Sequence, residues 1–238
     1  MNRAKRVCDY YDTFKSSLFS LFYHDLWGHP AKIMIYDITP AVSPRLQVWP
    51  GDTPPTRELL CDMHRGDQIT LSTLHATVHM GAHADAPSHY GLDAPTIDEC
   101  SLEPYLGPCQ VLHVNVPRRT CISPDLLPVA IQTTRLLLAT GTYPDPESFN
   151  TDFAALAPEL VQHLHRQGVK LIGIDTPGVD LFDSKDLPSH RQCLKHDIAI
   201  LEGLLLKHVP EGTYELIALP LKLVDFDGSP VRAILRAL

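Results

Sequence analysis

The sequence lacks several features that would mark a membrane, disulfide-rich or nucleic-acid-binding protein. No apolar run approaches the roughly 20 residues that cross a bilayer, so we expect no membrane span. Its six cysteines include no Cys-x-x-Cys pair, which argues against a disulfide scaffold or a zinc ribbon and favours reduced thiols in the cytoplasm. Basic residues number 20 against 28 acidic ones, so the net charge of −8 argues against a nucleic-acid partner.

The first 33 residues differ in composition from the remainder of the 238-residue chain. They carry five basic and three acidic side chains, whereas the rest is acidic. The apolar stretch SLFSLF is too short and too interrupted for a secretory signal. We therefore expect a poorly ordered N-terminal extension over residues 1–33 and one domain over residues 34–238, a targeting segment being the alternative for the extension.

From residue 34 onward, strand-like and helix-like stretches alternate. Apolar, β-branched runs bounded by Pro, Gly or Asp predict buried strands at residues 35–38, 111–116, 135–139, 169–174 and 214–221. Helices are predicted within residues 150–168 and over residues 188–196, each with a proline in its first turn. This order predicts an α/β domain with a mixed sheet and helices packed on it. Long connections, such as residues 51–67 and 87–108, are expected to be loops that build the site.

Chemistry concentrates in one short segment. Residues 79–89 contain three imidazoles and a carboxylate, namely His79, His83, Asp85 and His89. Along a straight strand the first and third of these would lie about 20 Å apart. Ligands that each bind one ion at about 2.0–2.2 Å must converge much more closely. Gly81 and Pro87 disfavour a helix, so the segment is predicted to curl as a loop around a metal ion.

This segment resembles the His-x-Gly-[Thr/Ala]-His-x-Asp-x-Pro-x-His signature of the metal-dependent cyclase family. From residue 34 onward the chain is similar to the bacterial-type kynurenine formamidases (arylformamidases). Further matching stretches follow in order: VWPGDTPP, YLGPC, GVKLIGIDTPGVD, SKDLPSH, ILEG, LIALPLKL and SPVRAIL. Gly178 departs from the family pattern, which has serine there. The resemblance implies a single domain of the swivelling β/β/α-like type.

The resemblance also implies a centre with two Zn²⁺ ions per chain, Mn²⁺ being the alternative metal. His79 and His83 would hold one ion, Asp85 would bridge both, and His190 with Glu202 would complete the second position. A bridging carboxylate suits two ions about 3.5–4 Å apart.

Other residues have implied or candidate supporting roles. The resemblance makes His89 the proton donor and acceptor, and Trp49 the aromatic contact to substrate. Asp175 and Asp180 are candidates to orient the metal-binding histidines. His196 remains an alternative ligand to its neighbour on the same predicted helix.

The implied activity is the hydrolysis of N-formyl-L-kynurenine to L-kynurenine and formate in tryptophan degradation, by a cytoplasmic homodimer. The sequence has no Gly-x-Ser-x-Gly elbow, which disfavours a serine nucleophile. Two alternatives stay open: an isatin-type or other cyclic amide hydrolase of the same family, and a non-catalytic metal-binding protein. His89 argues against the last, because sequestering a metal needs no additional proton shuttle.

Overall fold

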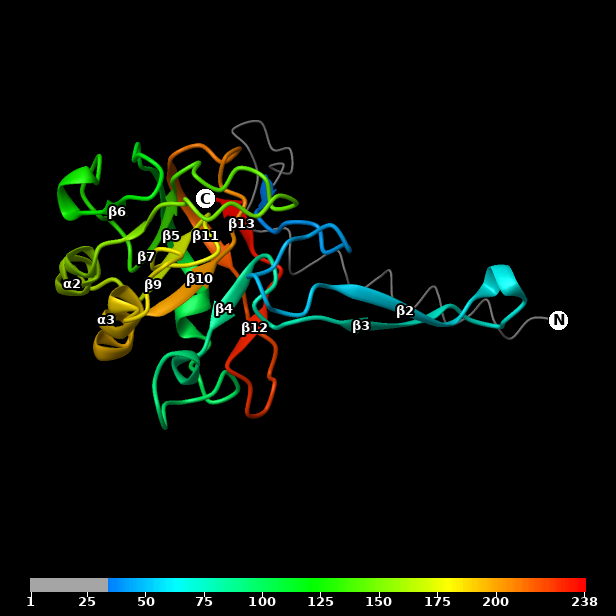
Figure 1. The fold of residues 1–238 in the computed structure, drawn as a ribbon. Helices are drawn as coiled ribbons and strands as arrows, with labels where there is room; N and C mark the ends of the chain where they lie inside the picture. The colour runs from blue at the N-terminus through cyan, green and yellow to red at the C-terminus, as the bar shows by residue number, and fades with distance from the viewer. Residues whose placement is uncertain (1–33) are drawn as a thin grey trace, which may run out of the picture. The chain divides into compact units, whose positions relative to one another are not determined.

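A nine-stranded mixed sheet organises the part of the chain that the computed structural model describes, residues 34–238 (Figure 1). The expected extension over residues 1–33 lies outside the described residues. In spatial order the strands are β1 (Ile35–Asp37), β13 (Ile234–Ala237), β11 (Gly212–Ile217), β5 (Leu106–His113), β7 (Arg135–Ala139), β9 (Leu171–Ile174), β10 (Ala199–Glu202), β4 (His83–Asp85) and β12 (Gly228–Pro230).

The centre of the sheet is parallel and its margins are antiparallel. Strands β5, β7, β9 and β10 run parallel, while β11, β13 and β1 on one side and β4 and β12 on the other pair antiparallel. Every residue of β7 and β9 is buried, as expected for parallel strands covered on both faces.

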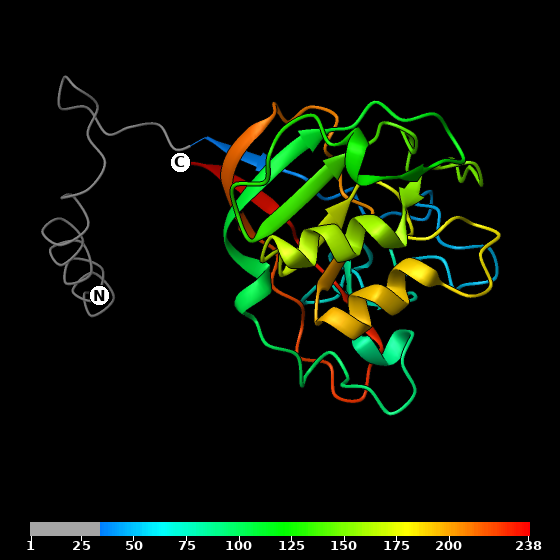
Figure 2. The same cartoon turned by 90° about the vertical axis from the view of Figure 1, so that its left-hand side faces the viewer.

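Two helices cover one face of this sheet, α2 (Pro158–Arg166) and α3 (Pro188–His196), which lie side by side in Figure 2. Leu160 and Leu164 of α2 pack with Leu136 and Leu138 of β7 in one core cluster, whereas Leu137 points into a second cluster on the other face. The alternation along β7 thus separates two apolar layers.

The predicted α/β class, with a mixed sheet and packed helices, is confirmed. Strand β7 and helix α3 have the predicted bounds, and α2 lies inside its predicted range. Strand β5 differs most, beginning five residues before the predicted run at Leu106. Strand β11 pairs with β5 over residues 106–111, so the ladder extends beyond the apolar run. The added residues include Gly107 and Pro108, which interrupt the apolar pattern expected of a strand.

The expectation that residues 51–67 form an irregular loop is wrong. Strand β2 (Thr56–Cys61) pairs antiparallel with β3 (Leu71–His75), and the short 3₁₀ helix η1 (Met63–Arg65) lies in the connection between them. This hairpin projects from the sheet in Figure 1. Most side chains of this hairpin are exposed. Its sequence therefore lacks the alternation of apolar and polar residues that would have predicted the strands.

Smaller elements complete the fold. A short parallel pair joins β6 (Cys121–Ile122) to β8 (Ala155–Leu156), and three further 3₁₀ turns are η2 (Pro87–His89), η3 (Glu103–Tyr105) and η4 (Pro124–Leu126). Within residues 34–238, no helix is long and apolar enough to cross a membrane. The five cysteines of this range are all free.

Candidate metal centre

Strand β4 delivers two of the predicted ligands, His83 and Asp85. Because side chains alternate along a strand, these residues share one face of the sheet. Residues 79–89 were predicted to curl throughout as a loop, and for residues 83–85 this is wrong, because they pair with both β10 and β12. The stretch before this strand bends at Gly81, with φ +55°, and this bend returns His79 to the other two predicted ligands. The stretch after it forms the turn η2.

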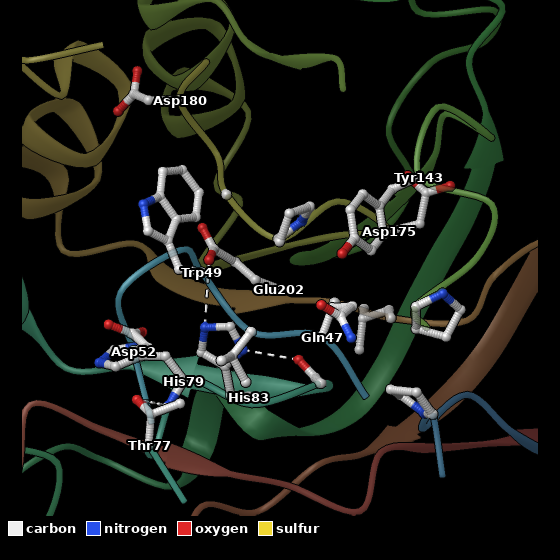
Figure 3. Close-up of a pocket in the computed structure, with 18 of the residues that line it drawn as sticks. Gln47, Trp49, Asp52, Thr77, His79, His83, Tyr143, Asp175, Asp180 and Glu202 are labelled. Carbon is white, nitrogen blue, oxygen red and sulfur yellow. Dashed lines mark hydrogen bonds and ion pairs between the residues drawn. The ribbon is translucent and has the colours of Figure 1, made fainter. Parts of the chain in front are cut away.

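Glu202 comes from the last position of β10, directly opposite His83 in the antiparallel register. Its Oε1 accepts a hydrogen bond of 2.7 Å from the backbone N–H of Val179, which fixes the carboxylate. Figure 3 shows Glu202 facing the His83 ring. The sheet pairing therefore explains how two residues far apart in sequence meet.

His190 lies in the first turn of α3, and Asp180 holds it there. The Asp180 carboxylate accepts hydrogen bonds from the backbone N–H groups of Ser189 and His190, so it also compensates the positive end of the helix. It further accepts a 2.7 Å bond from Nδ1 of His190. Nε2 of His190 is thereby left to face Asp85 and Glu202. Asp180 orients a predicted ligand, as the sequence suggested.

The ligand atoms are spaced as they would be around metal ions. Nε2 of His83 lies 3.4 Å from both Asp85 Oδ1 and Glu202 Oε2, and Nε2 of His190 lies 3.5 Å from Asp85 Oδ2. Such separations are long for hydrogen bonds, but a tetrahedron with bonds of about 2.1 Å has edges of about 3.4 Å. Asp85 Oδ2 is buried without a hydrogen-bond partner. The donor set therefore fits divalent ions.

Three groups of side chains within residues 34–238 could each hold an ion, one of them being His79, His89 and Asp227. The other two are triads that share one carboxylate. His79, His83 and Asp85 make the first, and Asp85, His190 and Glu202 make the second. All five predicted ligands are thus brought together, and a shared Asp85 is the arrangement that a bridging role requires. Imidazole with carboxylate is a ligand combination that zinc accepts.

The charges of this cluster depend on one another. Burial alone would lower the pKa of His83, but its contacts with Asp85 and Glu202 raise that pKa to about 10. The pKa of His190 rises to about 10 against the same effect of burial, through Asp180 and Asp85. Burial would raise the pKa of Asp85, yet the surrounding imidazoles hold it well below its usual range. Without metal, protonated histidines therefore balance the buried carboxylates, and an ion must displace their protons.

His89 lies at the edge of the centre, in the 3₁₀ turn η2. Its ring centroid is 4.1 Å from that of His79, and its side chain is 37% exposed. Nδ1 of His89 is 3.3 Å from Oδ2 of Asp227, and Nε2 of His79 is 3.0 Å from the same oxygen. Asp227 was not among the predicted site residues, although it lies two positions before the SPVRAIL stretch.

A cavity of about 420 Å³ opens onto these groups. His79, His83, His89, His190 and Glu202 line it, together with Trp49, Tyr143 and Asp227. Trp49 lies over the cavity in Figure 3 and also packs against Phe149, Phe153 and Phe182, with ring centroids 5.0–6.1 Å apart. Trp49 therefore belongs to an aromatic cluster and to the cavity wall. Tyr143 and the phenylalanines of this cluster were not predicted.

Two other candidates have different places. Asp175 accepts hydrogen bonds from the backbone of Thr140 and Gly141 and from the Thr140 hydroxyl, so it fixes a loop and not a histidine. His196 stacks on His165, with ring centroids 4.1 Å apart, at the opposite end of α3 from His190. It joins none of the candidate metal groups of the described residues.

The fold and the site define a class of α/β proteins with a histidine and carboxylate metal centre at one margin of a mixed sheet. The sequence pattern of the Cyclase family matches residues 36–181. Since this match covers more than half of the chain, the protein belongs to the Cyclase family.

Solved structures agree with this fold. A potential metal-dependent hydrolase with cyclase activity is 28% identical over 87% of this chain and 99% of its own, with a TM-score of 0.75. A predicted metal-dependent hydrolase from Bacillus stearothermophilus is 27% identical over 87% and 100%, also with a TM-score of 0.75. Isatin hydrolase A from Labrenzia aggregata, bound to benzyl benzoate, is 22% identical over 86% of this chain and 94% of its own, with a TM-score of 0.74. At this identity the comparison shows a similar fold alone.

Proposed function

We propose that the protein is a metal-dependent arylformamidase that hydrolyses N-formyl-L-kynurenine to L-kynurenine and formate. The observation that carries this proposal is the pair of metal-binding triads sharing Asp85, set beside His89 in a cavity with an aromatic wall. We further propose a cytoplasmic location, which the free cysteines of residues 34–238 support.

His79, His83, Asp85, His190 and Glu202 would hold two divalent ions, which we propose to be zinc. When bound, such ions supply Lewis-acid activation of water and stabilise negative charge on the amide oxygen. His89 is next to this centre and partly exposed to the cavity, so it can accept the proton of the attacking water and return it to the leaving nitrogen. An aromatic amine departs more readily once that nitrogen is protonated.

The aryl ring of the substrate is proposed to lie against Trp49. This indole lines the cavity, and Phe182 and Phe153 support it from behind, so a flat apolar face is held in place. Gly178 adds room on the same side, because a Cβ built there would lie 3.4 Å from the indole. A serine at position 178, as in the family pattern, would narrow the cavity beside the indole.

A cyclic amide is the second candidate substrate, supported by the similarity in fold to isatin hydrolase A. Both reactions would use the same set of metal-binding residues and the same proton transfer, with manganese as the alternative metal for the cyclic amide, so the arrangement of the centre does not discriminate between them. Metal analysis together with turnover of N-formylkynurenine, formanilide and isatin tests the choice. We expect the open-chain formamides to give the higher kcat/KM. Preference for isatin would establish the cyclic alternative, and no turnover with metals bound would favour the non-catalytic alternative.

Metal stoichiometry tests the bridged centre independently of the substrate. The wild-type protein should contain about two ions per chain, and Asp85→Ala should lose both. His190→Ala should mainly empty one position. His196→Ala is the matched control, because this residue lies on the same helix but stacks on His165. A single ion that persists in Asp85→Ala would contradict the proposed bridge.

We propose in addition that two copies associate through the hairpin of β2 and β3. Leu60, Met63 and Leu74 of this hairpin are between 53% and 61% exposed. An isolated two-stranded hairpin is at best marginally stable in water, so a second surface covering it would explain its apolar side chains. Sedimentation analysis should give a dimer for the wild type and a monomer for a Leu60→Asp, Leu74→Asp variant. An unchanged dimer would place the interface elsewhere.

A further inference from the structure

The carboxylate of Asp227 connects two histidines that have different proposed roles. Asp227 comes just before β12, which pairs with β4. A single oxygen, Oδ2, lies 3.0 Å from Nε2 of His79 and 3.3 Å from Nδ1 of His89. This arrangement suggests that one residue acts on both the metal position and the proton-transfer group.

The contact with His79 decides which of its nitrogens can bind metal. A neutral imidazole carries one N–H donor and one lone pair. An acceptor at Nε2 favours the tautomer with the proton there, which leaves the lone pair on Nδ1. Nδ1 is the atom that faces the metal triad, 3.1 Å from Asp85 Oδ1.

The same hydrogen-bond arrangement occurs at the other two histidines of the proposed centre. Nδ1 of His83 donates to the Gly81 carbonyl at 2.9 Å, and Nδ1 of His190 donates to Asp180 at 2.7 Å. In each case the nitrogen away from the metal position has its own acceptor, and the other nitrogen faces Asp85, the carboxylate that the two triads share. Asp227 therefore orients His79 in the way that the Gly81 carbonyl orients His83 and Asp180 orients His190.

The contact with His89 has a second consequence. With Nδ1 directed to Asp227, Nε2 is the nitrogen left to exchange a proton at the cavity. The two imidazole rings lie 4.1 Å apart at 35°, so the shared carboxylate also fixes the distance of His89 from the metal position. Proton transfer depends strongly on such placement.

We propose that Asp227 is a positioning residue that fixes the metal-binding tautomer of His79 and holds His89 for proton transfer. The second half of this proposal rests on the proposed function of His89, whereas the first half rests on the metal triad alone. Loss of Asp227 should consequently weaken metal binding and slow the reaction by separate routes.

Zinc affinity tests the first half, with chelator competition as the measurement. Asp227→Ala should bind zinc about 10–100-fold more weakly than the wild type. Asp227→Asn should recover part of this loss, because its amide oxygen still accepts a hydrogen bond but carries no charge. Asp225→Asn is the matched control, since Asp225 lies on the same loop and its left-handed φ of +64° suits asparagine. Unchanged affinity in Asp227→Ala, or a third zinc per wild-type chain that disappears in it, would overturn the positioning role.

Turnover at saturating zinc tests the second half. Asp227→Ala should lower kcat at least about tenfold with KM within about twofold, and Asp225→Asn should change neither. In a His89→Ala background, adding Asp227→Ala should cause no further loss of kcat, although zinc affinity still falls. Additive losses in kcat would overturn the coupling. If the wild type hydrolyses none of the amides, the proposed function fails, and zinc affinity alone decides the role of Asp227.

Discussion

Gly203 approaches Gly81 so closely that a Cβ built on Gly203 would lie 2.1 Å from the Gly81 carbonyl oxygen. Gly203 follows the proposed ligand Glu202 directly, and Gly81 lies between the proposed ligands His79 and His83. The contact therefore joins the two segments that supply most of the proposed centre. Gly203 also has φ +65°, a conformation that few residues other than glycine adopt readily.

Gly203→Ala is expected to destabilise the protein and the metal centre together. The left-handed conformation costs alanine about 1–2 kcal/mol, and overpacking against a backbone carbonyl adds about 1–3 kcal/mol. Denaturant unfolding should therefore show a loss of about 2–5 kcal/mol. Gly141→Ala is the control, because Gly141 has the same φ but no atom within 4 Å of the added Cβ. Equal losses in the two variants would show that the contact with Gly81 is unimportant.

The stability of the metal-free protein should depend on pH through His83 and His190. Their pKa values in the folded protein are about 10, above the ordinary value of 6.5. The folded state therefore binds these protons more tightly than the unfolded chain does. The resulting stability is fully present below pH 6.5 and is lost as the pH rises toward 10.

Thermal unfolding with a chelator present should accordingly show a Tm that falls between pH 6.5 and 10. His190→Gln should reduce the slope, because one of the two coupled imidazoles is gone. His113→Gln is a control, since His113 bonds the Val209 carbonyl away from the centre. Zinc binding at neutral pH should also release protons, measurable by calorimetry in buffers of different ionisation enthalpy. A flat Tm profile would contradict the charge balance described above.

The sequence predicts the centre better than its surroundings because coordination restricts both residue type and spacing. His79, His83 and Asp85 lie within one short segment, so their convergence needs only a local bend. His190 and Glu202 do not have this advantage, and only the family resemblance predicted them. Their meeting depends on β10 lying beside β4 and on α3 starting above that strand end, and spacing alone does not reveal either.

Asp227 and the hairpin show where prediction from one sequence fails. Asp227 reaches the centre because β12 pairs with β4, yet a lone aspartate before a glycine also suits an ordinary turn. Strands β2 and β3 escape detection because their side chains are exposed on both faces, so burial imposes no period of two. The buried central strand β7, by contrast, could be predicted directly from its apolar run.

Trp49→Ala should raise KM more than it lowers kcat. An aryl ring stacked on the indole is bound in the ground state and the transition state alike, and losing such uniform binding affects KM. Phe149→Ala is the matched control, because Phe149 packs on Trp49, 5.8 Å between centroids, but does not line the cavity. Steady-state kinetics and thermal unfolding should be measured on both variants. A fall in kcat alone, or equal effects in the two, would indicate that Trp49 serves packing and not substrate binding.

His89→Ala should separate catalysis from metal binding. His79, His83 and Asp85 complete the first triad without His89, and the second triad is more distant still, with 6.3 Å between the ring centroids of His89 and His190. The variant should therefore keep both ions and its fold. Its kcat should fall by about 10²–10⁴-fold, the usual contribution of a positioned proton-transfer group.

The substrate dependence of that loss carries the mechanistic information. Formanilides whose amines are poorer leaving groups need protonation of the nitrogen more, so His89→Ala should slow them most. His89→Asn should not restore the rate, because an amide donates a hydrogen bond but does not cycle a proton. Metal content and turnover must come from the same preparation. A lost ion would make His89 a ligand, and near-wild-type turnover with both ions bound would assign the proton transfer to another group.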